Sequence, residues 1–373
     1  MIFDRRDIEL MCLAGTYQWL PYEALCGFES LWPIRREMEL LSQTGLMTVS
    51  RSRQYVFLSP QGYEALNLWG YSYFPKAKRP YAGSPALRRR LEAARIMFTC
   101  LAAGIGVTAL ETDDLAGEPT FLPAFALRIG DGNLMNAASC AGFGHWGGTG
   151  YLIYYAGVES PGMYLSNELR HLHNLASVFD QRLNTPEAVI LAGESYGAVY
   201  ELLQNKTPSR RHGKHGFVDF WDAYERLDLP LQLVSCDDVG AMQLAIMRQC
   251  DYRARIAKAA FGARWTSLDE AIPDADGHVD GCPLVVAVDM DLRRILRVCS
   301  AAKVQGRREV MVAALPGQMS GLLLSVLPRD KGIRPLRIGR PVLENVFGRA
   351  VQLDEPDTDP GPATDKLGVL RYV

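Results

Sequence analysis

The stretch that most constrains this chain of 373 residues is residues 30–66, where the hydrophobic period changes twice. Its first part carries one apolar side chain every three or four residues, which predicts a helix with a single apolar stripe (Ile34, Met38, Leu41). We expect Ser30 to cap the start of this helix, because a hydroxyl oxygen satisfies a backbone N–H of the first turn. Gly45 is expected to end it, since glycine adopts the left-handed conformation without a Cβ penalty.

Beyond this helix the period changes to two, which is typical of strands. The alternation over residues 47–57 is interrupted by Arg51 and Arg53, which predicts a hairpin with a basic tip. Ser59 followed by Pro60 predicts the start of another helix. The order helix, basic-tipped hairpin, helix is that of a winged helix-turn-helix, in which one helix enters the major groove and the hairpin lies along phosphates. We therefore expect an N-terminal winged helix that binds double-stranded DNA.

Basic side chains near this motif are the expected DNA contacts. They come from the predicted helix, the hairpin tip, an aromatic and proline-rich connector and the start of the next helix: Arg35, Arg36, Arg51, Arg53, Lys76, Lys78, Arg79, Arg88 and Arg89. Residues 1–95 hold 13 basic and 9 acidic residues, whereas the rest of the chain holds 27 basic and 33 acidic residues. The basic excess thus coincides with the motif. The alternatives are a solvated helix face for Arg35 and Arg36, and a simple linker for the connector.

The N-terminal region also shows a family resemblance. The runs IRREMELLSQTGLM and YVFLSPQGYEAL, followed by the basic aromatic connector and an arginine-rich helix, resemble the replication-relaxation family. These are winged-helix proteins of plasmids and integrative conjugative elements, thought to assist replication initiation or relaxosome function. The resemblance covers about the first hundred residues. It implies an accessory role on DNA and assigns no catalytic residue.

Composition and pattern divide the chain into four parts. We expect a winged-helix domain in residues 1–70, a basic connector and arginine-rich helix in 71–110, an α/β domain in 111–353, and an acidic, proline-rich tail in 354–373. The helix expected after Ser84 has a narrow apolar stripe (Leu87, Leu91, Ala94, Phe98, Leu101). Such a stripe packs on another helix, either in a homodimer through residues 85–103 or in docking between the two domains of one chain.

The expected α/β domain contains a repeated unit of an apolar run, a turn and a helical pattern. The apolar runs are Ala188–Ala192, Leu231–Val234, Leu284–Val288 and Val310–Ala314. This repetition predicts a parallel or mixed sheet covered by helices, so the overall class is α/β. A glycine-rich stretch at residues 142–150 is expected to separate two strands. The last residues, 367–373, can add to a sheet edge, and the tail is a candidate site for a protein partner.

Three sequence patterns suggest a catalytic or metal-binding site, and each can also be explained by a structural role or by simple surface exposure. Gly193-Glu194-Ser195-Tyr196-Gly197 has the form of a nucleophile elbow, but no suitable acid and histidine follow it, so Ser195 or Glu194 is expected to be a helix cap. His171 and His173 resemble a metal-binding pair of a nuclease. Two residues apart on a predicted helix, they point in nearly opposite directions and are expected at the surface.

The third pattern is a set of acids at the predicted carboxyl ends of strands: Glu194, Asp237, Asp238 and Asp289. Together they could hold Mg²⁺, but no nuclease lysine accompanies them, and helix capping explains them without metal. We therefore expect no cofactor, no metal and no catalytic residue. The alternatives are a metal-dependent nuclease guided by the winged helix and a ligand-sensing transcription regulator.

The sequence also indicates the compartment. Its eight cysteines are scattered and form no Cys-x-x-Cys motif, which favours reduced thiols and a cytoplasmic location. No run of eighteen apolar residues is present, so no membrane contact is expected.

Overall fold

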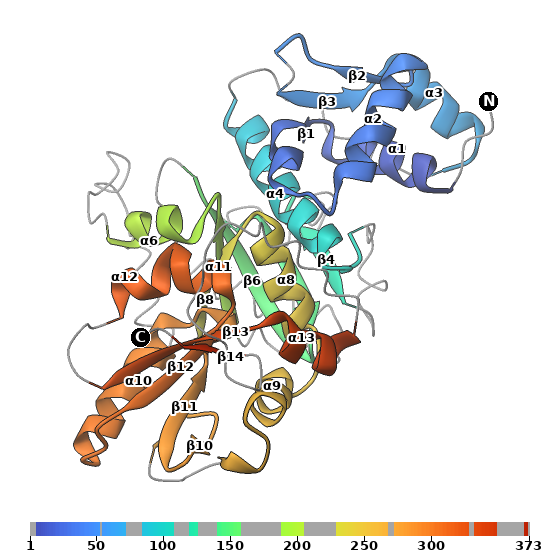
Figure 1. Cartoon of the computed structure of the whole chain (residues 1–373). Coiled ribbons are helices and arrows are strands. Elements are labelled where there is room, and N and C mark those ends of the chain that lie inside the picture. The colour runs from blue at the N-terminus through green and yellow to red at the C-terminus, as the bar shows by residue number, and fades with distance from the viewer. Residues whose placement is uncertain are drawn as a thin grey trace, which may run out of the picture.

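The computed structural model describes residues 5–52, 54–71, 84–107, 119–125, 140–157, 188–204, 229–267, 272–327, 332–348 and 369–371. The chain has a mixed α/β structure, in agreement with the predicted class (Figure 1). A small N-terminal unit lies at one end, and two larger sheets with their helices form the rest. Among the predicted DNA contacts, Arg53, Lys76, Lys78 and Arg79 lie outside the described residues, as do His171 and His173.

The N-terminal unit combines helices with a three-stranded antiparallel sheet of order β1-β3-β2. Its elements are α1 (Arg5–Tyr17), β1 (Leu20–Pro21), the 3-10 turn η1 (Glu23–Gly27), α2 (Trp32–Gln43), β2 (Met47–Val49), β3 (Tyr55–Leu58) and α3 (Pro60–Leu68). The predicted apolar stripe of α2 is buried against the rest of this unit. The helix, the hairpin and the following helix therefore lie where the sequence period placed them.

Local capping explains the ends of these elements, with one exception. The Ser59 hydroxyl accepts a hydrogen bond from the Gly62 N–H at 3.0 Å, and Gly45 has φ +80° after α2, as predicted. The prediction for Ser30 is wrong, because Leu31 occupies the N-cap position of α2. The Ser30 hydroxyl instead donates to Asp238 at 2.6 Å. A partner 208 residues away has replaced the local capping bond.

Helix α4 (Pro85–Ala102) connects the N-terminal unit to the rest of the molecule. It starts at the predicted cap, where the Ser84 hydroxyl accepts from the Leu87 N–H at 3.1 Å. Three residues of its apolar stripe, Leu87, Ala94 and Phe98, are buried within the chain. Ala94 and Phe98 belong to a core shared by the N-terminal unit, α4, helix α8 (Asp238–Met247) and the first large sheet. The homodimer stays a prediction, and its interface would have to use other side chains of residues 85–103.

The first large sheet is mixed and has the order β4-β5-β6-β7-β8. Its strands are β4 (Thr120–Pro123), β5 (Gly142–Trp146), β6 (Thr149–Ala156), β7 (Ala188–Gly193) and β8 (Leu231–Ser235), of which β6, β7 and β8 run parallel. Strand β5 lies in the glycine-rich stretch that was expected to be a connection. Its glycines leave room for aromatic rings, because a Cβ at Gly142 or Gly144 would overlap Phe121 or Trp146.

The second large sheet has the order β14-β13-β12-β11-β10-β9. Its strands are β9 (Trp265–Thr266), β10 (His278–Val279), β11 (Cys282–Val286), β12 (Val310–Ala314), β13 (Ile333–Ile338) and β14 (Val369–Arg371). Strands β11, β12 and β13 are parallel, and β14 pairs antiparallel with β13. The four predicted strand units are confirmed, but they divide between two sheets. The C-terminal segment adds to a sheet edge, as expected.

Helices cover both sheets and fill the space between them. They are α6 (Tyr196–Gln204), α8, α9 (Tyr252–Phe261), α10 (Leu292–Val304), α11 (Pro316–Gln318), α12 (Leu324–Val326) and α13 (Arg340–Phe347). One core joins a face of each sheet to α6 and α10, and another packs α9 and α13 on the second sheet. In the part of the chain that the structure describes, no helix has the length and apolar character to cross a membrane.

Candidate functional site

The exposed face of α2 carries a row of three side chains at a spacing of four residues. Trp32 is 59% exposed, Leu40 is 51% exposed, and Arg36 lies between them. The Arg36 guanidinium lies 5.9 Å from the centre of the Trp32 ring. Arg36 forms no ion pair with the residues that the structure describes. The face opposite the buried stripe therefore presents an available cation between two apolar side chains.

Arg35, the neighbouring predicted contact, is engaged within the unit. Its Nε donates to the Tyr22 hydroxyl at 3.1 Å, and a second nitrogen contacts the Cys26 Sγ at 3.2 Å. Its Nε also lies 3.8 Å from the Glu39 carboxylate, and the guanidinium covers the Tyr22 ring. Arg35 thus ties α2 to the segment before it, which is a positioning role.

The β2–β3 hairpin places Arg51 at an exposed turn. The turn is closed by the Ser50 hydroxyl, which accepts from the Tyr55 N–H at 3.1 Å. Behind the hairpin, the Trp19 ring packs against Tyr55 and Phe57, with ring centres 5.6 and 5.1 Å apart. These contacts hold the basic tip on a rigid base.

The predicted contacts at the start of α4 are also at the surface. Arg88 and Arg89 are exposed, and the Arg88 Nε lies 3.8 Å from the Glu92 carboxylate. The third arginine of this run, Arg90, is buried. It donates to the Thr16 carbonyl at 3.2 Å and covers the Phe125 ring, so it joins α4 to α1.

The turn before α2 is held by the start of α8. Both oxygens of Asp238 accept hydrogen bonds at 2.6 Å, from the Glu29 N–H and from the Ser30 hydroxyl. Asp237 caps α8 by accepting from the Gly240 N–H at 2.9 Å, as the simpler reading of these acids predicted. The carboxyl end of β8 therefore fixes the N-terminal end of α2 relative to the first sheet.

The remaining predicted chemical residues have structural partners. Glu194 pairs with Arg95 at 2.7 Å, and the Ser195 hydroxyl accepts from the Ala198 N–H at 3.2 Å, as expected for a cap of α6. Asp289 is fully buried at the end of β11. Over the described ranges, no group of three histidine, cysteine, aspartate or glutamate side chains is placed to hold a metal ion.

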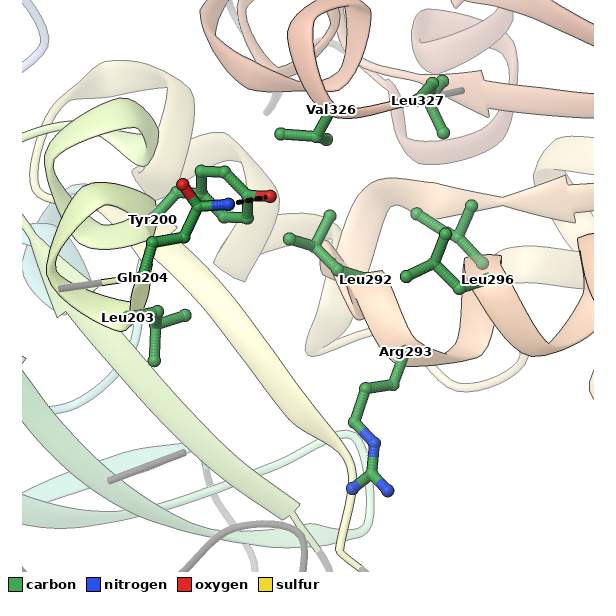
Figure 2. A pocket seen from close by; sticks show the side chains of 9 residues that line it. Tyr200, Leu203, Gln204, Leu292, Arg293, Leu296, Val326 and Leu327 are labelled. Carbon is green, nitrogen blue, oxygen red and sulfur yellow. Dashed lines mark hydrogen bonds between the residues drawn. The ribbon is translucent and has the colours of Figure 1, made fainter. Parts of the chain in front are cut away.

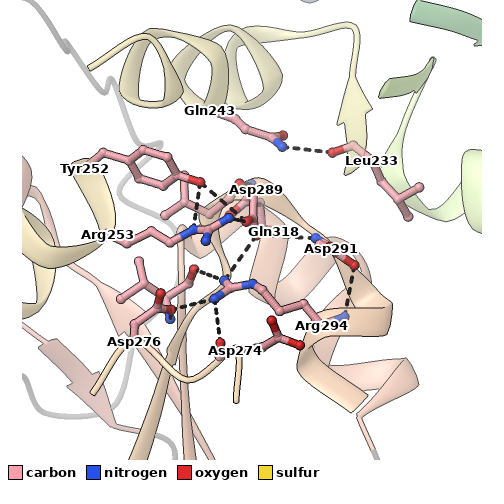
Figure 3. Close-up of polar contacts among 12 residues, drawn as sticks. Leu233, Gln243, Tyr252, Arg253, Asp274, Asp276, Asp289, Asp291, Arg294 and Gln318 are labelled. Carbon is pink, nitrogen blue, oxygen red and sulfur yellow. Dashed lines mark hydrogen bonds and ion pairs between the residues drawn. The ribbon is translucent and has the colours of Figure 1, made fainter. Parts of the chain in front are cut away.

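Sequence reasoning missed a buried charge network around Asp289 (Figure 3). The Asp289 carboxylate pairs with Arg253 from α9 and with Arg294 from α10, the latter at 3.4 Å. Arg294 is 4% exposed and also donates to Asp276 at 2.8 Å and to the Val286 carbonyl at 2.7 Å. Two helices and the end of β11 therefore meet at one carboxylate.

The pKa values of the two aspartates of this turn are shifted in opposite directions. Burial acts to raise the pKa of Asp289, but Arg294 and Arg253 outweigh it, and the net pKa is lowered. Burial raises the pKa of Asp291, and the neighbouring charge of Asp289 raises it further. Asp291 caps α10 by accepting from the Arg294 N–H at 3.0 Å. The two arginines thus stabilise the ionised form of Asp289. At Asp291 the nearby positive charges only partly offset the effect of burial.

A cavity of about 570 Å³ opens beside the network. One wall comes from the starts of β6, β7 and β8, and the other comes from α9, β9 and the first turns of α10. A second cavity, of about 500 Å³, lies between α6, α10 and α12 (Figure 2). Its lining is mainly apolar (Tyr200, Leu203, Leu292, Leu296, Val326, Leu327), and Arg293 points away from it.

Comparison with models of known families, with curated proteins and with solved structures finds no match to this chain. The candidate sites of this chain are therefore the α2 face, the β2–β3 hairpin and the two cavities. The change of hydrophobic period in the sequence indicated both α2 and the β2–β3 hairpin. The sequence carried little signal for the charge network, whose members come from four separate segments.

Proposed function

We propose that the N-terminal unit is a winged helix that binds duplex DNA through α2 and the β2–β3 hairpin. The observation that carries this proposal is the exposed row on α2, in which Arg36 lies between Trp32 and Leu40 without an ion pair to the described residues. The sheet order β1-β3-β2 and the basic turn at Arg51 support it. Exposed cations on one helix and an adjoining hairpin form the electrostatic footprint of such a motif.

The parts of this surface have different roles in the proposal. Helix α2 enters the major groove, where Arg36 contacts a phosphate and the apolar side chains meet thymine methyl groups. Arg51 lies along the phosphate backbone. Arg35 positions α2 through Tyr22 and Glu39, and any contact it makes with DNA is secondary. Arg88 and Arg89 at the start of α4 extend the basic surface, and Arg53, Lys76, Lys78 and Arg79, which lie outside the described residues, stay predicted contacts.

The resemblance to the replication-relaxation family gives the proposal its biological setting. We propose a cytoplasmic accessory protein that serves replication, mobilisation or regulation of a mobile element. In this proposal the α/β part has an assembly role and no catalytic role, because Glu194, Asp237, Asp238 and Asp289 each serve a cap, an ion pair or a hydrogen bond to the N-terminal unit. A ligand-sensing regulator is the second candidate, and the polar cavity beside the charge network favours it.

Binding to a fluorescent duplex of mixed sequence tests this function. The double variant Arg36→Ala, Arg51→Ala should bind about tenfold or more weakly than the wild type, because two phosphate or base contacts are lost. Arg308→Ala is the matched control, since Arg308 is an exposed arginine between α10 and β12. Equal affinity of the double variant and the control, or no binding by the wild type at low salt, would contradict the proposal.

A further inference from the structure

We propose that the cavity beside the charge network binds a small organic cation that carries an ammonium or guanidinium group. The volume of about 570 Å³ lies in the range of small-molecule sites. Its walls come from both halves of the α/β part, where β6, β7 and β8 begin and where α9 and α10 begin. Sites between two packed units are frequent positions for ligands. This inference does not depend on the proposed DNA binding.

The charges that line the cavity favour a cation. Four aspartates face three arginines there, and Asp289 lies behind them (Asp251, Asp274, Asp276, Asp291; Arg253, Arg294, Arg297). Each arginine is already paired within the protein: Arg253 with Asp289, Arg294 with Asp276 at 2.8 Å, and Arg297 with Asp274 at 2.8 Å. An anionic ligand would have to compete with these carboxylates, whereas a cationic ligand would not.

Two carboxylates of the wall remain for a ligand. Among the residues described, Asp251 and Asp291 form no ion pair. Asp291 is 2% exposed, and one of its oxygens is used to cap α10. Asp251 stands at the start of α9 in the left-handed conformation, with φ +54°. Asp251 is exposed to solvent, whereas Asp291 is a buried carboxylate that forms no ion pair with the described residues. Such burial is costly, so a bound ammonium or guanidinium group would stabilise Asp291.

Other side chains of the wall fit the same ligand. Tyr252 and Trp265 supply aromatic surface, and the Trp265 ring is fixed because its Nε1 donates to the Asp276 carbonyl at 2.8 Å. Aromatic faces attract organic cations. Gln232 also lines the cavity, is 5% exposed, and has a side-chain oxygen without a hydrogen-bond partner in the described structure. An N–H group brought by the ligand would satisfy that oxygen.

Titration calorimetry on the full-length chain tests the site with defined probes. Agmatine supplies a guanidinium and an ammonium group, putrescine supplies two ammonium groups, and succinate is an anion of similar size. The variants are Asp251→Asn and Asp291→Asn. Asparagine tolerates the left-handed conformation at position 251 and still caps a helix at position 291, so both changes remove charge with little effect on the backbone.

Asp280→Asn is the matched control. Asp280 also has a positive φ, of +52°, and pairs with Arg264 outside the cavity. We expect agmatine or putrescine to bind the wild type and the control equally, and succinate not to bind. Each cavity variant should weaken binding about tenfold, the effect of one charge-assisted hydrogen bond. No binding of either cation, or equal binding by Asp251→Asn, Asp291→Asn and the wild type, would overturn the proposal.

Discussion

Two helices of this molecule, α2 and α10, carry arginines in opposite environments. On α2, Arg36 is exposed and makes no ion pair with the described residues, and Arg35 is half-buried against Tyr22. On α10, Arg294 is 4% exposed and is held by two aspartates and two backbone carbonyls. The arginine on α10 stabilises the fold, whereas Arg36 on α2 is available to a binding partner.

The difference lies in desolvation. A guanidinium buried beside Asp289 must keep its partners, because an unpaired buried charge costs several kilocalories per mole. An exposed guanidinium such as that of Arg36 stays hydrated, and removing it costs the fold little. We therefore expect substitutions in the charge network to change stability and substitutions on the α2 face to change binding.

The largest effect is expected from Asp289→Ala, which leaves Arg294 and Arg253 without their shared partner. The free energy of unfolding should fall by about 3–5 kcal/mol, the cost of breaking a buried ion pair by removing one side. Asp274→Asn is the matched comparison, because its pair with Arg297 is about half exposed and asparagine tolerates the φ of +69° at this position, so it should cost less than about 1 kcal/mol. Urea denaturation measures both. Similar losses in the two variants would remove the distinction between buried and exposed pairs.

An intermediate case is Glu92 on α4, whose side chain is 23% exposed beside Arg88. Burial raises the pKa of Glu92 to about 7, although Arg88, Arg89 and Arg95 act to lower it. An acid whose pKa is raised on folding favours the folded state while it is protonated. That contribution is present below its ordinary pKa of 4.5 and is lost as the pH rises to 7.

Glu92→Gln should therefore be more stable than the wild type by about 1–2 kcal/mol at pH 8 and equally stable at pH 4.5. Thermal unfolding at the two pH values measures the difference. A stability change that is independent of pH would show that Glu92 is ionised in the folded chain. Glu92 would then behave as a hydrated charge, like the exposed Arg36, and not as a desolvated charge like those of the network.

Local signals in the sequence were sufficient for much of the fold. The caps at Ser59 and Ser84 could be predicted, because each capping hydrogen bond joins residues only three positions apart in the sequence. Strands β7, β8, β11 and β12 could also be predicted, because each is a continuous run of apolar residues. The division of these strands between two sheets was not visible, since strand order depends on contacts between distant segments.

The candidate site shows the same limit. The exposure of Arg36 could be predicted from the hydrophobic period of α2, and its contact with DNA stays a prediction. Ser30 was misread as a cap, because its actual partner is Asp238 on α8. Asp289 was recognised only as an acid at a strand end, because Arg253 lies 36 residues before it in the sequence. Burial of these charges is a property of the packed chain, and no local pattern encodes it.

The salt dependence of duplex binding by Arg36→Ala and Arg35→Ala tests the central claim most directly. Each lost phosphate contact lowers the slope of log affinity against log salt by about 0.9. We predict this decrease for Arg36→Ala and an unchanged slope for Arg35→Ala, whose guanidinium is engaged with Tyr22 and Glu39. An unchanged slope in Arg36→Ala, with the wild type binding in a salt-dependent manner, would contradict the assignment of the α2 face as the DNA contact.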